Sequence, residues 1–152
     1  MGIDPGTTSF SFALANSNHQ VVVSRTVKIV LPRGKCPYRS VALGVCNLLS
    51  AIYKVVRVVH VAVELQLRSP MIEVMQSVVT WCYMQNISCE VVTAYTWRKR
   101  IGARSQGSWD KNKKHSVAHV QRCLGYHLLD HNQAESCMIA LGAAYCVYPV
   151  EY

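Results

Sequence analysis

The sequence predicts a single α/β domain in which helices cover both faces of a mixed β-sheet. Two strand-like segments, 9–16 and 20–30, are joined by turn-forming residues at 16–19, which indicates an antiparallel hairpin. Strands and helices then alternate along the chain, a pattern typical of a mixed sheet with helices on its faces. A length of 152 residues suits one domain with a core of its own.

The other elements follow from hydrophobic spacing and from the positions of glycine and proline. The segment 55–65 is rich in β-branched residues and almost continuously apolar, which predicts a buried central strand. A first strand ends at Asp4, and because Met1 stands directly before Gly2, this strand is short or its start is trimmed. The remaining predictions are a strand at 88–93, helices at 38–54, 71–85, 111–124 and 133–147, a helical turn at 94–101, and loops at 31–37 and 102–110.

The composition favours a globular protein that binds a polyanion. Hydrophobic residues make up 51% of the chain and charged residues 16%, which excludes an intrinsically disordered protein. The net charge of +8 predicts contact with a nucleic-acid backbone, because lysine and arginine release counterions from phosphates. A basic charge that serves only solubility is the alternative.

The cysteines indicate a reducing compartment. Seven are present, an odd number without any C-x-x-C pair, and most stand in apolar runs. They are expected to be small core residues, so neither a disulfide framework nor a zinc site is predicted. The apolar stretches are only as long as strands, which predicts no membrane span, and no signal peptide is visible. The expected location is a reducing compartment that contains DNA, such as the cytoplasm, the nucleus, a virus-infected cell or an organelle.

Four of the eight acidic residues are candidates for a metal centre. Asp4 follows the first strand, and Glu64 stands near the end of the buried strand 55–65, where an unpaired carboxylate would be costly. Asp130 and Glu135 flank the start of the last helix. If the first and fourth strands are neighbours, these side chains meet at one edge of the sheet. Two Mg²⁺ or Mn²⁺ ions about 3.5–4 Å apart could bind there and hydrolyse a phosphodiester.

Each of these acids also has a purely structural interpretation. Asp4 could form the turn that follows it, and Glu135 could complement the dipole of the last helix. Glu64 could pair with Arg57 or Arg68, although a glutamate in such an apolar strand needs a strong reason to be there. The combination of the acids, more than any one of them, favours a metal centre.

The same segments resemble the RuvC-like Holliday junction resolvases, which are nucleases of the RNase H-like superfamily. Residues 1–14 are similar to the family's first strand and hairpin, and 59–79 to its fourth strand and following helix. Residues 88–120 are similar to its fifth strand, basic loop and next helix, and 131–145 to its final helix. The resemblance implies an RNase H-like fold with a five-stranded mixed sheet. It also implies a structure-selective DNA endonuclease that makes paired nicks in four-way junctions, using Mg²⁺ or Mn²⁺, two ions per active site.

The catalytic and metal-binding acids that the family's motifs match directly are Asp4, Glu64 and Glu135. The family often has a further acid, or a histidine, three or four residues before the last acid, where this chain has Asn132 and His131. Asp130 stands five residues before Glu135, off its helical face, but it can still reach the site as the N-cap of that helix. We predict that Asp130 is the fourth acid, with His131 as the rival metal ligand.

A basic segment on both sides of 102–110 is the predicted nucleic-acid interface. Lysine and arginine neutralise phosphates, and Trp97 and Trp109 could stack on unpaired bases. Trp97 could equally fill the core, as large aromatic residues usually do. The resemblance implies that one lysine near the start of helix 111–124 supports the active site. The predicted nucleic-acid-binding residues are Arg98, Lys99, Arg100, Lys111, Lys113 and Lys114.

Paired cuts in a four-way junction of near two-fold symmetry predict a homodimer that acts on branched DNA. The helix 71–85 is the expected interface because it is apolar almost all round, although burial within one monomer would explain the same composition. A non-catalytic nucleic-acid-binding module remains an alternative, as does another RNase H-like nuclease that cleaves RNA–DNA hybrids or acts as a transposase. Residues 2–8 also resemble the first phosphate loop of actin-like ATPases, but the chain shows no second glycine-rich loop.

Overall fold

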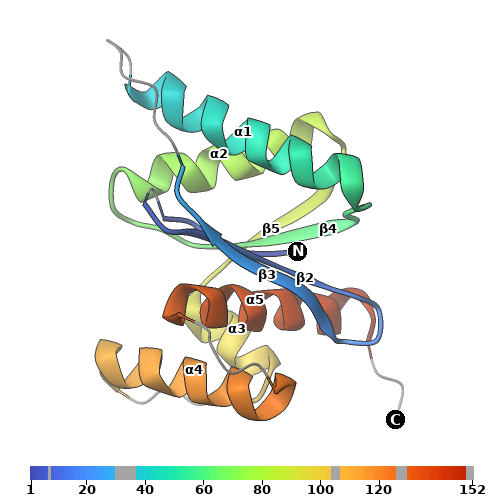
Figure 1. Ribbon diagram of the computed structural model, residues 1–152, viewed down its shortest axis with the longest axis vertical. Coiled ribbons are helices and arrows are strands. Elements are labelled where there is room, and N and C mark those ends of the chain that lie inside the picture. The colour runs from blue at the N-terminus through green and yellow to red at the C-terminus, as the bar shows by residue number, and fades with distance from the viewer. Residues whose placement is uncertain (7, 30–36, 104–106, 126–129, 150–152) are drawn as a thin grey trace.

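A five-stranded mixed sheet lies between two layers of helices (Figure 1) in the computed structural model, which describes the chain except residues 7, 30–36, 104–106, 126–129 and 150–152. The strands are β1 (Gly2–Asp4), β2 (Phe10–Ala15), β3 (Val21–Val27), β4 (His60–Glu64) and β5 (Ser88–Val92). They lie in the order β3-β2-β1-β4-β5. The pairs β1–β2 and β2–β3 are antiparallel, whereas β1–β4 and β4–β5 are parallel. The mixed sheet predicted from the sequence is therefore confirmed.

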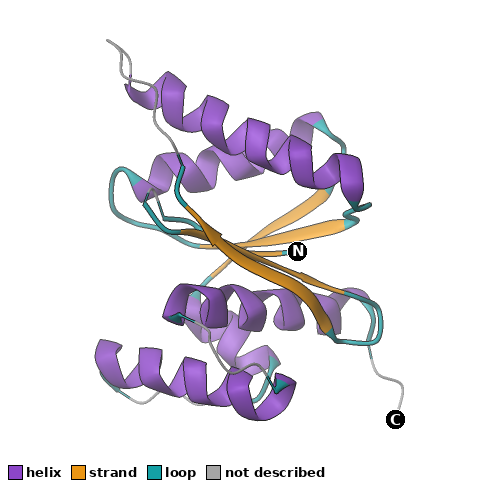
Figure 2. Cartoon of the chain, in the orientation of Figure 1, coloured by secondary structure: helices purple, strands orange, loops and turns teal. Residues whose placement is uncertain are grey.

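Helices cover both faces of this sheet, as Figure 2 shows. On one face lie α1 (Pro37–Val55) and α2 (Met71–Met84), which pack against each other. On the other face α5 (His131–Val147) lies directly on the strands, and α3 (Ala94–Arg100) and α4 (Trp109–Leu124) pack against α5. The sheet thus separates two apolar cores, one under α1 and α2 and one around α5. None of the helices in the described part of the chain is both long and apolar enough to span a membrane.

The hairpin between β2 and β3 forms where its turn chemistry predicts it. The Asn16 side-chain oxygen accepts hydrogen bonds from the backbone N–H groups of Asn18 and Gln20, each 3.0 Å long. His19 has a φ of 57°, the left-handed conformation that such turns use. The ladder then runs from the pair Ala15–Val21 to the pair Phe10–Val27.

The predicted strand 55–65 was wrong in its first half. Helix α1 continues to Val55, and only 60–64 form β4, because these are the residues that pair with β1 and β5. Val55 and Val59 are 83% and 50% exposed, so the apolar run extends beyond the buried strand into a connection. The predicted helical turn 94–101 is the full helix α3, and α4 begins at Trp109 inside the expected loop 102–110. The expected loop 31–37 falls almost entirely outside the described residues.

Gly2 allows the central strand β1 to lie directly against helix α5. A Cβ atom added at Gly2 would overlap the backbone of Ser136 and Ala140 on that helix. Because β1 is paired on one side with β2 and on the other with β4, it cannot move away from α5 without disturbing the sheet. This close approach brings Asp4, at the end of β1, near the start of α5.

We expect Gly2→Ala to lower the free energy of unfolding by roughly 1–3 kcal/mol, the usual cost of adding a methyl group to a packed core. Urea denaturation followed by circular dichroism measures this change. Gly142→Ala is the matched control, because a Cβ there would stand an ordinary 3.5 Å from its neighbours on α3. Equal stability of the two variants would show that β1 and α5 do not need their close approach.

Candidate metal centre

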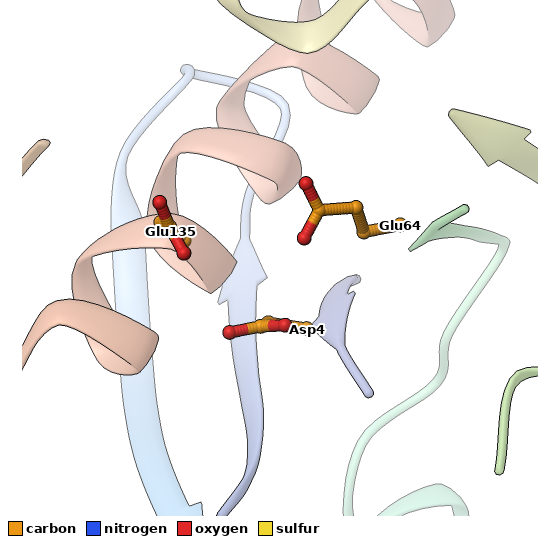
Figure 3. Close-up of side chains that lie close together, drawn as sticks. All are labelled: Asp4, Glu64 and Glu135. Carbon is orange, nitrogen blue, oxygen red and sulfur yellow. The ribbon is translucent and has the colours of Figure 1, made fainter. Parts of the chain in front are cut away.

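Three carboxylates meet at one end of the sheet (Figure 3). Asp4 ends β1, Glu64 ends β4, and Glu135 lies in the second turn of α5. Strands β1 and β4 are parallel neighbours with Ile3 opposite Val63, so the next residues of the two strands emerge side by side. One ligand oxygen from each of the three acids lies within 4.8 Å of the others. The sequence predicted that these three acids converge, and in the structure they do.

Burial and mutual repulsion favour protons on this cluster. The pKa of Asp4 is raised from 3.8 to about 8, first by burial and then by the nearby charges of Glu64 and Glu135. The pKa of Glu64 is raised from 4.5 to about 7 by burial and by Glu135. Burial also raises the pKa of Glu135. A cation bound among the three acids would stabilise their ionised forms, which burial and crowding now disfavour.

Arg98 is a buried cation directly beside the acids. It is 6% exposed, and its Nη2 donates hydrogen bonds to Glu135 at 3.4 Å and to Ser116 at 3.3 Å. Its guanidinium group lies over the ring of Trp97, 4.3 Å from the centroid. Arg98 thereby works against the rise in pKa of Glu135 and Glu64 and fixes the position of Glu135.

A second cation, Lys113 of α4, lines the same cleft as the acids. Its positive charge lowers the pKa of Asp4 and Glu135, and its Nζ lies 2.6 Å from Nε2 of His131. The pKa of His131 is itself lowered, first by burial and then by Lys113, so the neutral ring can accept a hydrogen bond from the ammonium group. Of the three candidate lysines, Lys113 is the one that lines the cleft, whereas Lys111 and Lys114 are exposed.

Asp130 is the N-cap of α5, as its sequence position allowed, but it does not join the three clustered acids. One of its oxygens accepts a hydrogen bond from the backbone N–H of Gln133 at 2.8 Å. The other oxygen accepts one from the Thr26 hydroxyl at 3.0 Å. Its charge still contributes a small rise to the pKa of Asp4. Asp130 and His131 therefore border the cluster, and Asn132 lines the same cleft.

The residues of the predicted basic interface have different surroundings in the structure: some are ion-paired or buried, and others are exposed. Arg100 holds Glu90 through two hydrogen bonds of 2.6 and 2.8 Å, and Arg98 is buried as described. Lys99 is exposed and lines the cleft. Trp97 is fully buried, so the interpretation as a core residue is correct. The side chain of Trp109 lies outside what the structure describes.

The acids lie in a cleft of about 920 Å³. Sequence reasoning missed Arg68, which it considered only as a partner for Glu64. Within the described residues no ion pair joins Glu64 to Arg57 or Arg68, and Arg68 lines the cleft instead. Nη1 of Arg98, a buried donor near the acids, has no hydrogen-bond partner among the described residues, whereas the Trp97 indole interacts with the Glu64 carboxyl and lowers its pKa. The cleft therefore offers carboxylate ligands to a cation, with the Arg98 guanidinium group beside them.

The donor set fits Mg²⁺ or Mn²⁺. Both ions prefer oxygen ligands, and Asp4, Glu64 and Glu135 supply only oxygen. Bound divalent charge would also reverse the repulsion that now raises the pKa of these acids.

Metal binding should release protons, because the two highest pKa values of the cluster are about 8 for Asp4 and about 7 for Glu64. Affinity for Mn²⁺ should therefore rise between about pH 6 and pH 8.5, as the carboxyl groups lose protons to solvent. Calorimetry in buffers with different heats of protonation should count about one to two protons released near pH 7. In Asp4→Asn this release should largely disappear. Unchanged proton release in that variant would place the metal elsewhere.

Comparison of sequences finds no matching family model and no matching curated protein. Solved structures, however, superpose over most of the chain. RuvC of Thermus thermophilus in complex with a Holliday junction substrate has a TM-score of 0.72 and 16% identity, covering 97% of this chain and 94% of that one. The fowlpox virus resolvase in complex with Holliday junction DNA has a TM-score of 0.63 and 16% identity, covering 95% and 97%.

The yeast mitochondrial Holliday junction resolvase has a TM-score of 0.60 and 14% identity, covering 94% of this chain and 77% of its own. These three proteins come from a bacterium, a virus and an organelle, and each superposes on between 94% and 97% of this chain. The protein therefore has the RNase H-like fold of the RuvC-like Holliday junction resolvases.

Proposed function

We propose that the protein is a Holliday junction resolvase, a structure-selective DNA endonuclease that makes paired nicks in four-way junctions. The observation that carries this proposal is the meeting of Asp4, Glu64 and Glu135 in a cleft of a RuvC-like fold. The structural neighbours described above are resolvases, and two of them are bound to junction DNA. The net charge of +8 supports a polyanionic substrate.

The chemistry proposed for this cleft is phosphodiester hydrolysis. A water oxygen forms a new bond to phosphorus while the bond to the leaving sugar oxygen breaks, and that oxygen takes up a proton. Mg²⁺ or Mn²⁺, two ions per site, would stabilise the charge that develops on the phosphate. Asp4, Glu64 and Glu135 would hold the ions, with Asp130 or His131 at the border of the site as a further ligand.

The basic side chains of the cleft have different proposed roles: one holds a carboxylate, and the others bind phosphates. Arg98 holds Glu135 through an ion pair of 3.4 Å and opposes the rise in pKa that burial causes in this carboxyl. We propose that Lys113, which lines the cleft and contacts His131, donates a hydrogen bond to an oxygen of the scissile phosphate. Lys99 and Arg68 line the rest of the cleft and can neutralise neighbouring phosphates.

Asp4→Asn and Glu64→Gln should each reduce cleavage of a synthetic four-way junction by at least about a thousandfold with Mg²⁺, while junction binding stays largely intact. Both substitutions remove a metal ligand without removing a phosphate contact. Gel electrophoresis of end-labelled junctions measures the nicks, and Glu73→Gln, an acid of α2 outside the cleft, is the control.

Linear duplex and an RNA–DNA hybrid belong in the same cleavage assay. Preferential cleavage of the hybrid would show that the protein is an RNase H-like nuclease that acts on RNA–DNA hybrids and not a resolvase. Full nicking by either acid variant would contradict the mechanism, and binding without any cleavage by the wild type would leave a non-catalytic binding module.

We further propose that two copies act together, because paired nicks need two active sites. The expected interface helix α2 is partly committed to the monomer: Val78 and Trp81 are buried, and the Trp81 indole donates to Ser50 of α1 at 3.0 Å. The C-terminal end of α2 is the proposed interface, because Tyr83 and Met84 are 87% and 71% exposed.

Sedimentation at micromolar concentration should give twice the 17.0 kDa of one chain. The double substitution Tyr83→Glu and Met84→Glu should shift the protein to a monomer, because charge opposes burial of this surface. A wild-type protein that stays monomeric on a junction and nicks one strand only would contradict the paired model.

A reducing compartment that contains DNA remains our proposal for where the protein works. Five cysteines of the described chain, Cys46, Cys82, Cys89, Cys137 and Cys146, are free thiols.

A further inference from the structure

Tyr95 is the one aromatic residue that lines the acidic cleft, within the part of the chain that the structure describes. It is the second residue of α3, and 73% of it is exposed. A single exposed tyrosine is common on protein surfaces, so the surroundings of the ring decide what it can do.

The backbone that carries Tyr95 is firmly held. The Thr93 side chain caps α3 by accepting a hydrogen bond from the Thr96 N–H at 3.1 Å. Trp97 is fully buried in the core and anchors the helix there, and Arg98 is buried beside the acids. The exposed ring is thus attached to a fixed helix directly after β5, beside the end of β4 that carries Glu64.

The neighbours of Tyr95 in the cleft are suited to a nucleic-acid strand. Lys99 follows one helical turn later, so it shares the side of α3 that carries Tyr95. Both residues line the cleft together with Arg68 and the three acids. An aromatic ring that lines a cleft together with cations is an arrangement that binds single-stranded nucleic acid, with stacking on bases and neutralisation of phosphates.

We propose that Tyr95 stacks on an unpaired base at the branch point of the junction and thereby selects branched over linear DNA. The inference rests on the proposed function, because the ring lies in the cleft that would cut the DNA. In a continuous duplex every base is already stacked and paired, so its faces are closed to the ring. At a branch point the ring can replace a lost base neighbour, while Lys99 and Arg68 hold the phosphates on either side.

The test uses four-way junctions with 2-aminopurine at the branch point or inside an arm, bound in Ca²⁺ and without cleavage. Wild type should change the fluorescence of the branch-point base strongly and that of the arm base little. Tyr95→Ala should lose this change and bind the junction roughly tenfold more weakly, with little effect on duplex binding. Tyr95→Phe should keep both, because its ring stacks equally well. Tyr148→Ala, a tyrosine at the opposite end of the sheet, is the control.

A wild-type fluorescence change that survives in Tyr95→Ala, or equal losses on junction and duplex, would overturn the stacking role. The outcome is separate from that of the cleavage assay. A protein that binds junctions but never nicks them would refute the proposed nuclease while this measurement still decides the role of Tyr95. A protein that binds junctions and duplex equally would refute the selection by Tyr95 as well.

Discussion

The crowding of three half-buried carboxylates at one end of the sheet is the constraint on which the rest of the structure depends. Asp4, Glu64 and Glu135 place ligand oxygens within 4.8 Å of one another, at a cost visible in the raised pKa of all three. The three acids are held together because they lie on two central strands, β1 and β4, and on the helix packed against them, α5. Two parallel central strands end together, and the missing side chain of Gly2 lets α5 approach them closely. Compact apolar cores on both faces then hold strands and helix in place.

Positive charge is arranged around the cluster in an order of decreasing burial. Arg98 is buried beside the acids and is held by Glu135, Ser116 and the Trp97 ring. Lys113 is half-buried in the cleft and lowers the pKa of Asp4, and Lys99 is exposed in the same cleft. The inner charge orients a carboxylate, whereas Lys99 is exposed in the cleft, where the proposed function would use it for a DNA phosphate. One basic run of sequence therefore has two physical roles, decided by the direction in which each side chain leaves its helix.

Much of this could be predicted from sequence because the signals are local. Turn residues mark the hairpin, and a glutamate in an apolar strand is too costly to be accidental. The predictions that were wrong concern features that depend on tertiary packing. The apolar run 55–65 does not reveal that only 60–64 have strand partners. The WRKR run resembles an exposed basic patch, and the burial of Arg98 follows only from the contact of α3 with α5. Tyr95 was missed because the tryptophans nearby were the stronger aromatic signal, and the fold buries Trp97.

The central claim is that the three clustered acids, and not Asp130 alone, define the metal centre. Electron paramagnetic resonance of Mn²⁺ measures free ion directly and so counts the ions bound per protein. Wild type should bind Mn²⁺, and Asp130→Asn should keep at least one ion, because this acid is held as a helix cap by Gln133 and Thr26. Glu135→Gln should lose Mn²⁺ binding at the same concentration. Retention of all bound Mn²⁺ by Glu135→Gln, with its loss in Asp130→Asn, would contradict the account.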